Sequence, residues 1–130
     1  MKISRETDYA IRCVFYLAGR QENVAMISEI AAEMSVPKSF LAKILQKLTR
    51  ASIVTSYRGI KGGFKLAKPP AKISLLEVIE AIEPIAMNIC ASDDRLCSFS
   101  GTCSIHPVWL EVRETVEKML RKKNFAKLKA

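Results

Sequence analysis

Residues 36–70, VPKSFLAKILQKLTRASIVTSYRGIKGGFKLAKPP, decide the fold of this 130-residue chain. Pro37 suits the first position of a helix that runs to about Arg50, because proline lacks the N–H that would be unpaired there. The inward stripe of this helix consists of Phe40, Leu41, Ile44, Leu45 and Leu48. Its outward face offers hydrogen-bond donors and no carboxylate, and carries Lys38, Ser39, Ala42, Lys43, Gln46, Lys47 and Arg50.

Two strand patterns follow this helix, ASIVTSY at 51–57 and KLAKPP at 65–70, joined by the glycine-rich turn RGIKGGF at 58–64. The pattern predicts a β-hairpin that ends at Pro69 and Pro70. Its tip carries Arg58 and Lys61 among glycines, which let a backbone approach another surface closely.

The segments before Pro37 predict two more helices. Residues 4–20 are apolar on nearly every face, which is typical of a helix buried on several sides, with Cys13 as a small core residue. ISEIAAEM at 27–34 has the spacing of a short amphipathic helix, which Ser35 and Val36 interrupt. Two short helices with a tight break and a hairpin directly after them predict a mainly α fold with a small β-hairpin wing, a winged helix-turn-helix.

The distribution of charged residues along the chain indicates what kind of molecule the protein binds. Lysine and arginine number 21 against 13 acidic residues, a net charge of +8. No acidic residue lies between Glu33 and Glu77, and that stretch holds Lys38, Lys43, Lys47, Arg50, Arg58, Lys61, Lys65, Lys68 and Lys72. A long basic stretch without counter-charge favours a polyanion. Because the apolar stripe of the third helix is committed to the core, we expect double-stranded DNA and no membrane.

The C-terminal part predicts a dimer. Ser74 and Glu77 have the spacing of a capping box that starts a helix limited by Pro84. A long helix from Pro107 to about Lys123 presents one apolar stripe, made of Trp109, Val112, Val116, Met119 and Leu120. We expect this stripe to form a homodimer seam, since two-fold symmetry suits a helix-turn-helix that reads a palindrome. The tail KKNFAKLKA at 122–130 is expected to fray.

The segment between these helices holds three of the four cysteines and the sole histidine: Cys90, Cys97, Cys103 and His106. We expect a cytoplasmic protein, because no apolar run could span a bilayer and the N-terminus meets charge too soon for a signal peptide. A reducing compartment disfavours disulfides, and zinc sites usually use closer ligand pairs. Loosely spaced thiolates suit an iron–sulfur cluster.

Three functional regions follow: a DNA-binding domain at 1–83, a cluster-binding cysteine loop at 84–106, and a dimerisation helix with a basic tail at 107–130. We expect no enzyme, because the sole histidine lies in the cysteine loop and no nucleophile is paired with a base.

The chain resembles the Rrf2 family of winged-helix transcription regulators over almost its whole length. The resemblance rests on TDYAIR at 7–12, VPKSFLAKILQKL at 36–48, RGIKGGF at 58–64, and three cysteines followed by HPVW at 106–109. It implies the three-cysteine branch of dimeric regulators (IscR-, NsrR- and RirA-like), most often repressors, in which a [2Fe–2S] or [4Fe–4S] cluster senses iron, redox state or nitric oxide. By this resemblance Cys90, Cys97 and Cys103 are cluster ligands, Ser39, Ala42 and Lys43 face bases, and Arg58 reaches the minor groove.

The resemblance offers two candidates for the fourth ligand. His106 is separated from Cys103 by two residues, as in one group of relatives, and Asp8 of the partner chain matches the aspartate used in another. We favour Asp8 slightly because its flanking residues also match. Six residues separate Cys90 from Cys97 where the family has five, which leaves the cluster type and the signal open. The alternative is an Rrf2-like regulator that binds zinc or no metal at this loop.

Overall fold

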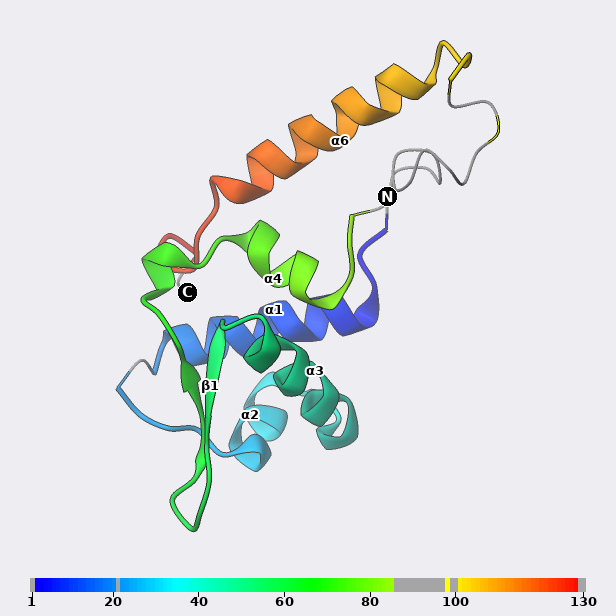
Figure 1. Cartoon of the computed structure of the whole chain (residues 1–130). Helices are drawn as coiled ribbons and strands as arrows, with labels where there is room; N and C mark the ends of the chain where they lie inside the picture. Colours follow the sequence, from blue (N-terminus) through cyan, green and yellow to red (C-terminus); the bar gives the residue numbers. More distant parts are fainter. Residues whose placement is uncertain (1, 21, 86–97, 99–100, 129–130) are drawn as a thin grey trace.

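The computed structural model describes residues 2–20, 22–85, 98 and 101–128 of the chain. Its elements are α1 (Arg5–Ala18), α2 (Ile27–Met34), α3 (Lys38–Arg50), β1 (Val54–Tyr57), β2 (Gly63–Leu66), a 3₁₀ turn (Pro70–Lys72), α4 (Leu75–Ile82) and α6 (His106–Arg121) (Figure 1). The described part is therefore mainly helical with one small hairpin, as the sequence predicts.

Helix α1 lies at the centre of the core. Ser4 caps its start by accepting a hydrogen bond from the Thr7 backbone N–H at 3.1 Å. The helix ends at Ala18, two residues before the predicted end, because the Gly19 N–H turns back to the Tyr16 carbonyl oxygen at 3.2 Å. Cys13 is fully buried among apolar side chains, as expected, and burial raises the pKa of its thiol to about 12.

Helices α2 and α3 form the helix-turn-helix. Ser35 ends α2 in the left-handed conformation, with φ of 54°, and the Val36 N–H donates to the Ala31 carbonyl oxygen. Pro37 lies at the N-cap of α3, one position before the predicted one. The core face of α3 consists of Leu41, Ile44, Leu45 and Leu48, all fully buried.

Phe40 was assigned to this inward stripe, and that prediction is wrong. Its side chain is 50% exposed and makes an edge-to-face contact with Tyr9, with ring centroids 6.1 Å apart. The first turn of α3 extends beyond the fully buried part of the core. There the Phe40 ring contacts Tyr9, which is itself only partly buried.

The hairpin β1–β2 is antiparallel and pairs Val54 with Leu66 and Tyr57 with Gly63. The second strand starts two residues earlier than predicted, at Gly63. Ala25, just before α2, exchanges two backbone hydrogen bonds with Phe64 at 2.8 and 2.9 Å. This bridge fastens the hairpin to the helix-turn-helix.

Helix α4 packs across α1 and α3. Ser74 accepts a hydrogen bond from the Glu77 N–H at 3.1 Å, which is half of the predicted capping box. The other half is absent from this helix start, because the Glu77 carboxylate pairs with Lys68 instead. The helix ends at Ile82, before Pro84, as predicted.

The segment after α6 returns to the core, so the prediction that the tail frays is wrong for residues 122–128. The Lys123 carbonyl oxygen accepts a hydrogen bond from the Leu75 N–H at 2.8 Å, and the Phe125 N–H donates to the Ile73 carbonyl oxygen at 3.2 Å. The Phe125 side chain is fully buried in the main core cluster. The segment after α6 is thereby held beside the start of α4 (Figure 1).

Replacing Phe125 with alanine should cost about 3–5 kcal/mol of unfolding free energy, because a fully buried aromatic ring leaves a cavity. Urea unfolding followed by circular dichroism measures this loss. Lys127→Ala, an exposed neighbour, is the matched control and should change the free energy by less than about 0.5 kcal/mol. Equal stability of the two variants would mean that the tail does not belong to the folding core.

Candidate functional site

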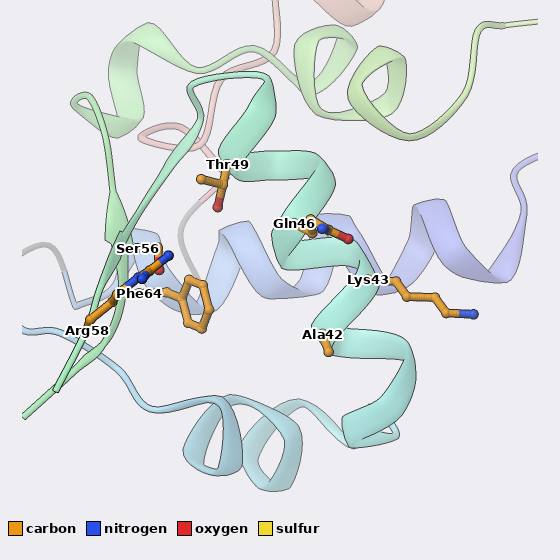
Figure 2. Close-up of a pocket in the computed structure, with 7 residues that line it drawn as sticks. All are labelled: Ala42, Lys43, Gln46, Thr49, Ser56, Arg58 and Phe64. Carbon is orange, nitrogen blue, oxygen red and sulfur yellow. The ribbon is translucent and has the colours of Figure 1, made fainter. Parts of the chain in front are cut away.

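An open groove of about 580 Å³ separates α3 from the hairpin (Figure 2). It is lined by Ala42, Lys43, Gln46 and Thr49 from α3 and by Ser56, Arg58 and Phe64 from the hairpin. Figure 2 shows these side chains arising from both walls, with Lys43 extending from α3 away from the hairpin. Among the described residues, no carboxylate lines this groove.

The cations of the basic stretch divide into two sets. Lys47 pairs with Glu6 of α1, with Nζ 2.7 Å from Oε1, and Lys68 pairs with Glu77. The remaining cations have no ion pair within the described part of the chain: Lys38, Lys43, Arg50, Arg58, Lys61, Lys65 and Lys72. The unpaired set keeps its charge available for phosphates.

The predicted DNA-facing residues of α3 are exposed, with one exception. Lys38, Ser39, Ala42, Lys43, Gln46 and Arg50 are all exposed to solvent. Lys47 is half-buried and held by Glu6, so its charge is already compensated within the domain. Sequence reasoning missed Thr49, Ser56 and Phe64 as groove residues. Helical spacing could have indicated Thr49, which follows Gln46 by three positions on the same face.

The wing tip has a tight, glycine-dependent turn. Gly59 adopts a φ of 102°, which side chains rarely tolerate, and its carbonyl oxygen accepts a hydrogen bond from the Gly62 N–H at 2.9 Å. A Cβ at Gly62 would lie 2.4 Å from the Tyr57 carbonyl oxygen. Arg58 and Lys61 are exposed on this turn, as the sequence predicts.

The cysteine segment is described only in part, since Cys90 and Cys97 lie outside the described residues. Cys103 is a half-buried free thiol. Its carbonyl oxygen accepts a hydrogen bond from the His106 N–H at 3.4 Å. Within the described ranges no three histidine, cysteine or acidic side chains form a metal-binding group.

His106 is the first residue of α6, and its side chain is 92% buried. The N-cap is Ile105, so His106 does not cap this helix. Among the described side chains, only the His106 Nδ1 atom is a buried polar atom without a hydrogen-bond partner. A buried nitrogen without a partner among the described residues is costly, and an imidazole three residues after a thiol in the sequence has the chemistry of a metal ligand.

Asp8 has a different environment. Its side chain is half exposed on α1 and forms an ion pair with Arg12, one helical turn further on, at 3.0 Å. The same guanidinium lies 5.7 Å from the ring centroid of Tyr9. Asp8 is thus engaged within its own chain and remains open to solvent.

The predicted dimer stripe of α6 divides between two faces. Val116 and Leu120 pack against Leu76, Ile79 and Ile85 of the same chain. Met119 is 62% exposed and Val108 is 42% exposed, whereas Trp109 and Val112 are half-buried. One face of α6 therefore anchors it to α4, and the other offers apolar surface.

None of the described helices is long and apolar enough to cross a membrane.

The chain matches the Rrf2 family, described as iron-dependent transcriptional regulators, over residues 3–130. It is 31% identical over 120 residues to a protein of Aquifex aeolicus named as an HTH-type transcriptional regulator, covering 90% of this chain and 83% of that protein. Its fold is similar to that of T. potens IscR, with a TM-score of 0.75, 23% identity, and coverage of 98% of this chain and 85% of that one. It is also similar to CymR, the global cysteine regulator of B. subtilis, with a TM-score of 0.76, 22% identity, and coverage of 98% and 95%. With its winged helix-turn-helix and basic groove, the chain belongs to the Rrf2 family of DNA-binding transcriptional regulators, and it is not an enzyme.

Proposed function

We propose that this chain is a dimeric repressor of transcription. Its operator binding is controlled by an iron–sulfur cluster held by Cys90, Cys97 and Cys103. The observation that carries DNA recognition is the groove between α3 and the wing, which has Lys43 and Arg58 at its walls and no carboxylate from the described part of the chain. Helix α3 enters the major groove, with Ser39, Ala42 and Lys43 toward base edges. Arg58 reaches the neighbouring minor groove.

The donor set of the cysteine segment supports a soft metal centre. Cys103 supplies a thiol, and the buried Nδ1 of His106 lacks any partner among the described residues. This favours His106 over the partner's Asp8 as fourth ligand, since Asp8 is solvated and paired with Arg12. A bound cluster with one non-thiolate ligand would supply reactivity toward small oxidants or nitric oxide.

Two copies of α6 form the dimer seam in this proposal. The exposed face of α6 carries Val108, Val112 and Met119 at spacings of four and seven residues, which place them along one side of the helix. A two-fold seam of this kind sets the distance between the two DNA-reading heads, which has to match successive major grooves.

A series of packed helices connects the cysteine segment to the groove, so a change at one could alter the position of the other. His106 starts α6, α6 packs on α4, and α4 packs on both α1 and α3. Just before the cysteine segment, Glu83 accepts a hydrogen bond from the Thr7 hydroxyl of α1 at 2.9 Å. Hydrogen bonds from Ser4 and Thr7 favour the ionised form of Glu83 and hold its pKa below the usual value. Release of the cysteine segment would change the angle at which α6 holds each head.

A second candidate is a regulator of the same fold that senses through cysteine thiols, with zinc or no metal. The half-buried free Cys103 and the similarity to a structure described as a global cysteine regulator favour it. Anaerobic purification with iron, sulfide and zinc analysis separates the two candidates, because only a cluster gives a brown protein with visible absorption.

DNA binding should weaken steeply with salt, because cations of α3 and the wing release counterions from phosphates. Arg58→Ala should lower affinity for a palindromic duplex about tenfold and reduce the slope of log K against log salt by about one. Fluorescence anisotropy between low and moderate salt measures both quantities. Lys118→Ala removes the same charge from the exposed side of α6 and should leave the slope unchanged. An affinity that does not depend on salt would contradict DNA binding through this groove.

Replacing Cys90, Cys97 or Cys103 singly with alanine should abolish the visible chromophore of anaerobically purified protein. Cys13→Ala is the control and should keep it, because the Cys13 thiol is buried and stays protonated at neutral pH. His106→Ala should shift the spectrum and shorten the lifetime of the chromophore in air, whereas Asp8→Ala should do neither. Full iron and sulfide in all three triad variants would rule out Cys90, Cys97 and Cys103 as the cluster ligands.

Replacing Val112 and Met119 together with aspartate should give monomers, because charge would be buried unpaired in the seam. Sedimentation equilibrium measures the change. Val116→Asp is the contrasting variant: it faces α4 of its own chain and should lower the thermal stability of the domain. A double variant that stays dimeric would move the seam away from this face.

A further inference from the structure

Ile60 lies at the tip of the wing, and its side chain is 100% exposed. The hairpin extends as a finger beyond α2 and α3, and its loop is the outermost part of that end of the molecule (Figure 1). No other large apolar residue of the described part is so fully exposed: the next, Met119, is 62% exposed.

The fold does not require isoleucine at this position. The turn is closed by the hydrogen bond between Gly62 and Gly59, and by the positive φ of Gly59. A β-branched apolar residue is disfavoured in a turn, where polar residues and glycine are usual. Ile60 therefore exposes apolar surface to water, and no packing contact with the described residues compensates for this.

The neighbours of Ile60 indicate what it meets. Arg58 and Lys61 flank it within the turn, and neither has an ion pair within the described part of the chain. Arg58 also lines the groove beside α3, so the tip lies at the edge of the surface that carries DNA recognition. Two cations on either side of an apolar side chain match a minor groove, where phosphates border an apolar sugar wall.

We propose that Ile60 enters the minor groove beside each half-site and makes the regulator select A·T over G·C at the base pairs that the wing meets. This rests on the proposed binding of α3 and the wing to DNA. The minor groove distinguishes these pairs chiefly by the guanine N2 amino group, which projects into the groove of a G·C pair. A branched apolar side chain held there by Arg58 and Lys61 collides with that group and gives it no hydrogen-bond acceptor. Apolar side chains are used in the same way by other minor-groove binders.

The test uses a duplex selected by the wild-type protein from a random-sequence pool, with hydroxyl-radical footprinting to locate the pairs under the wing. Each of those pairs is then prepared as A·T, as G·C and as inosine·C, which presents nearly the major-groove pattern of G·C but lacks the N2 amino group. For the wild type, G·C should weaken binding about fivefold or more, and inosine·C should restore it to within about twofold of A·T. For Ile60→Ala, the three duplexes should bind within about twofold of one another.

Three variants serve as controls. Ile60→Ala should lower affinity for the A·T duplex about fivefold with an unchanged salt slope, because no charge is removed. Arg58→Ala should reduce that slope. Ile3→Ala removes another exposed isoleucine, in the segment before α1 and outside the wing, and should leave the A·T preference intact. Since Ile60 is 100% exposed and packs on no described residue of its own chain, its variants should unfold at the wild-type temperature.

The outcomes separate the two proposals. If Ile60→Ala kept the wild-type order of the three duplexes, this inference would be overturned while DNA binding through the groove stood. If the wild type bound no selected duplex in a salt-dependent way, the proposed function itself would fall.

Discussion

The burial of α1 on three sides is the constraint on which the rest of the structure depends. Its small and apolar side chains, Ala10, Cys13, Val14 and Leu17, are almost completely excluded from water, and α2, α3 and α4 all pack against this helix. Because each of those helices is positioned by the same central element, the groove between α3 and the wing has a fixed shape. The chain end adds to this core through Phe125, which pins the segment that follows α6.

The distribution of charge follows from the same packing. Glu6 of α1 faces Lys47 on the inner side of α3, and Glu77 of α4 faces Lys68 after the wing. Partly exposed pairs of this kind contribute modest stability, but they compensate two cations of the basic stretch. Lys72 lies in the 3₁₀ turn, and the other cations of the stretch that have no ion pair in the described part lie on α3 and along the wing, where they make this side of the molecule positive.

Helix α6 joins the region of the cysteine segment to the core of the DNA-binding domain. Its start holds a buried histidine with an unpaired ring nitrogen, and its later turns pack through Val116 and Leu120 onto α4. A rigid helix transmits a change at one end to the other, since its length is fixed by backbone hydrogen bonds. In the proposed function, this helix would couple ligand binding at the cysteine segment to the angle of the DNA-reading head.

The sequence by itself determined the helix order, the hairpin, the basic face of α3 and the family, because these depend on local spacing: apolar residues every three or four positions, glycines at the turn, and an acid-free stretch of chain. It also indicated that Cys13 is a core residue. Only the tertiary structure decided how distant groups pair. It showed that Lys47 is neutralised by Glu6, that Phe40 lies outside the core, that Phe125 lies inside it, and that one face of α6 belongs to its own domain. These outcomes depend on which surfaces meet in space, and residue spacing along one segment carries no information about its partner.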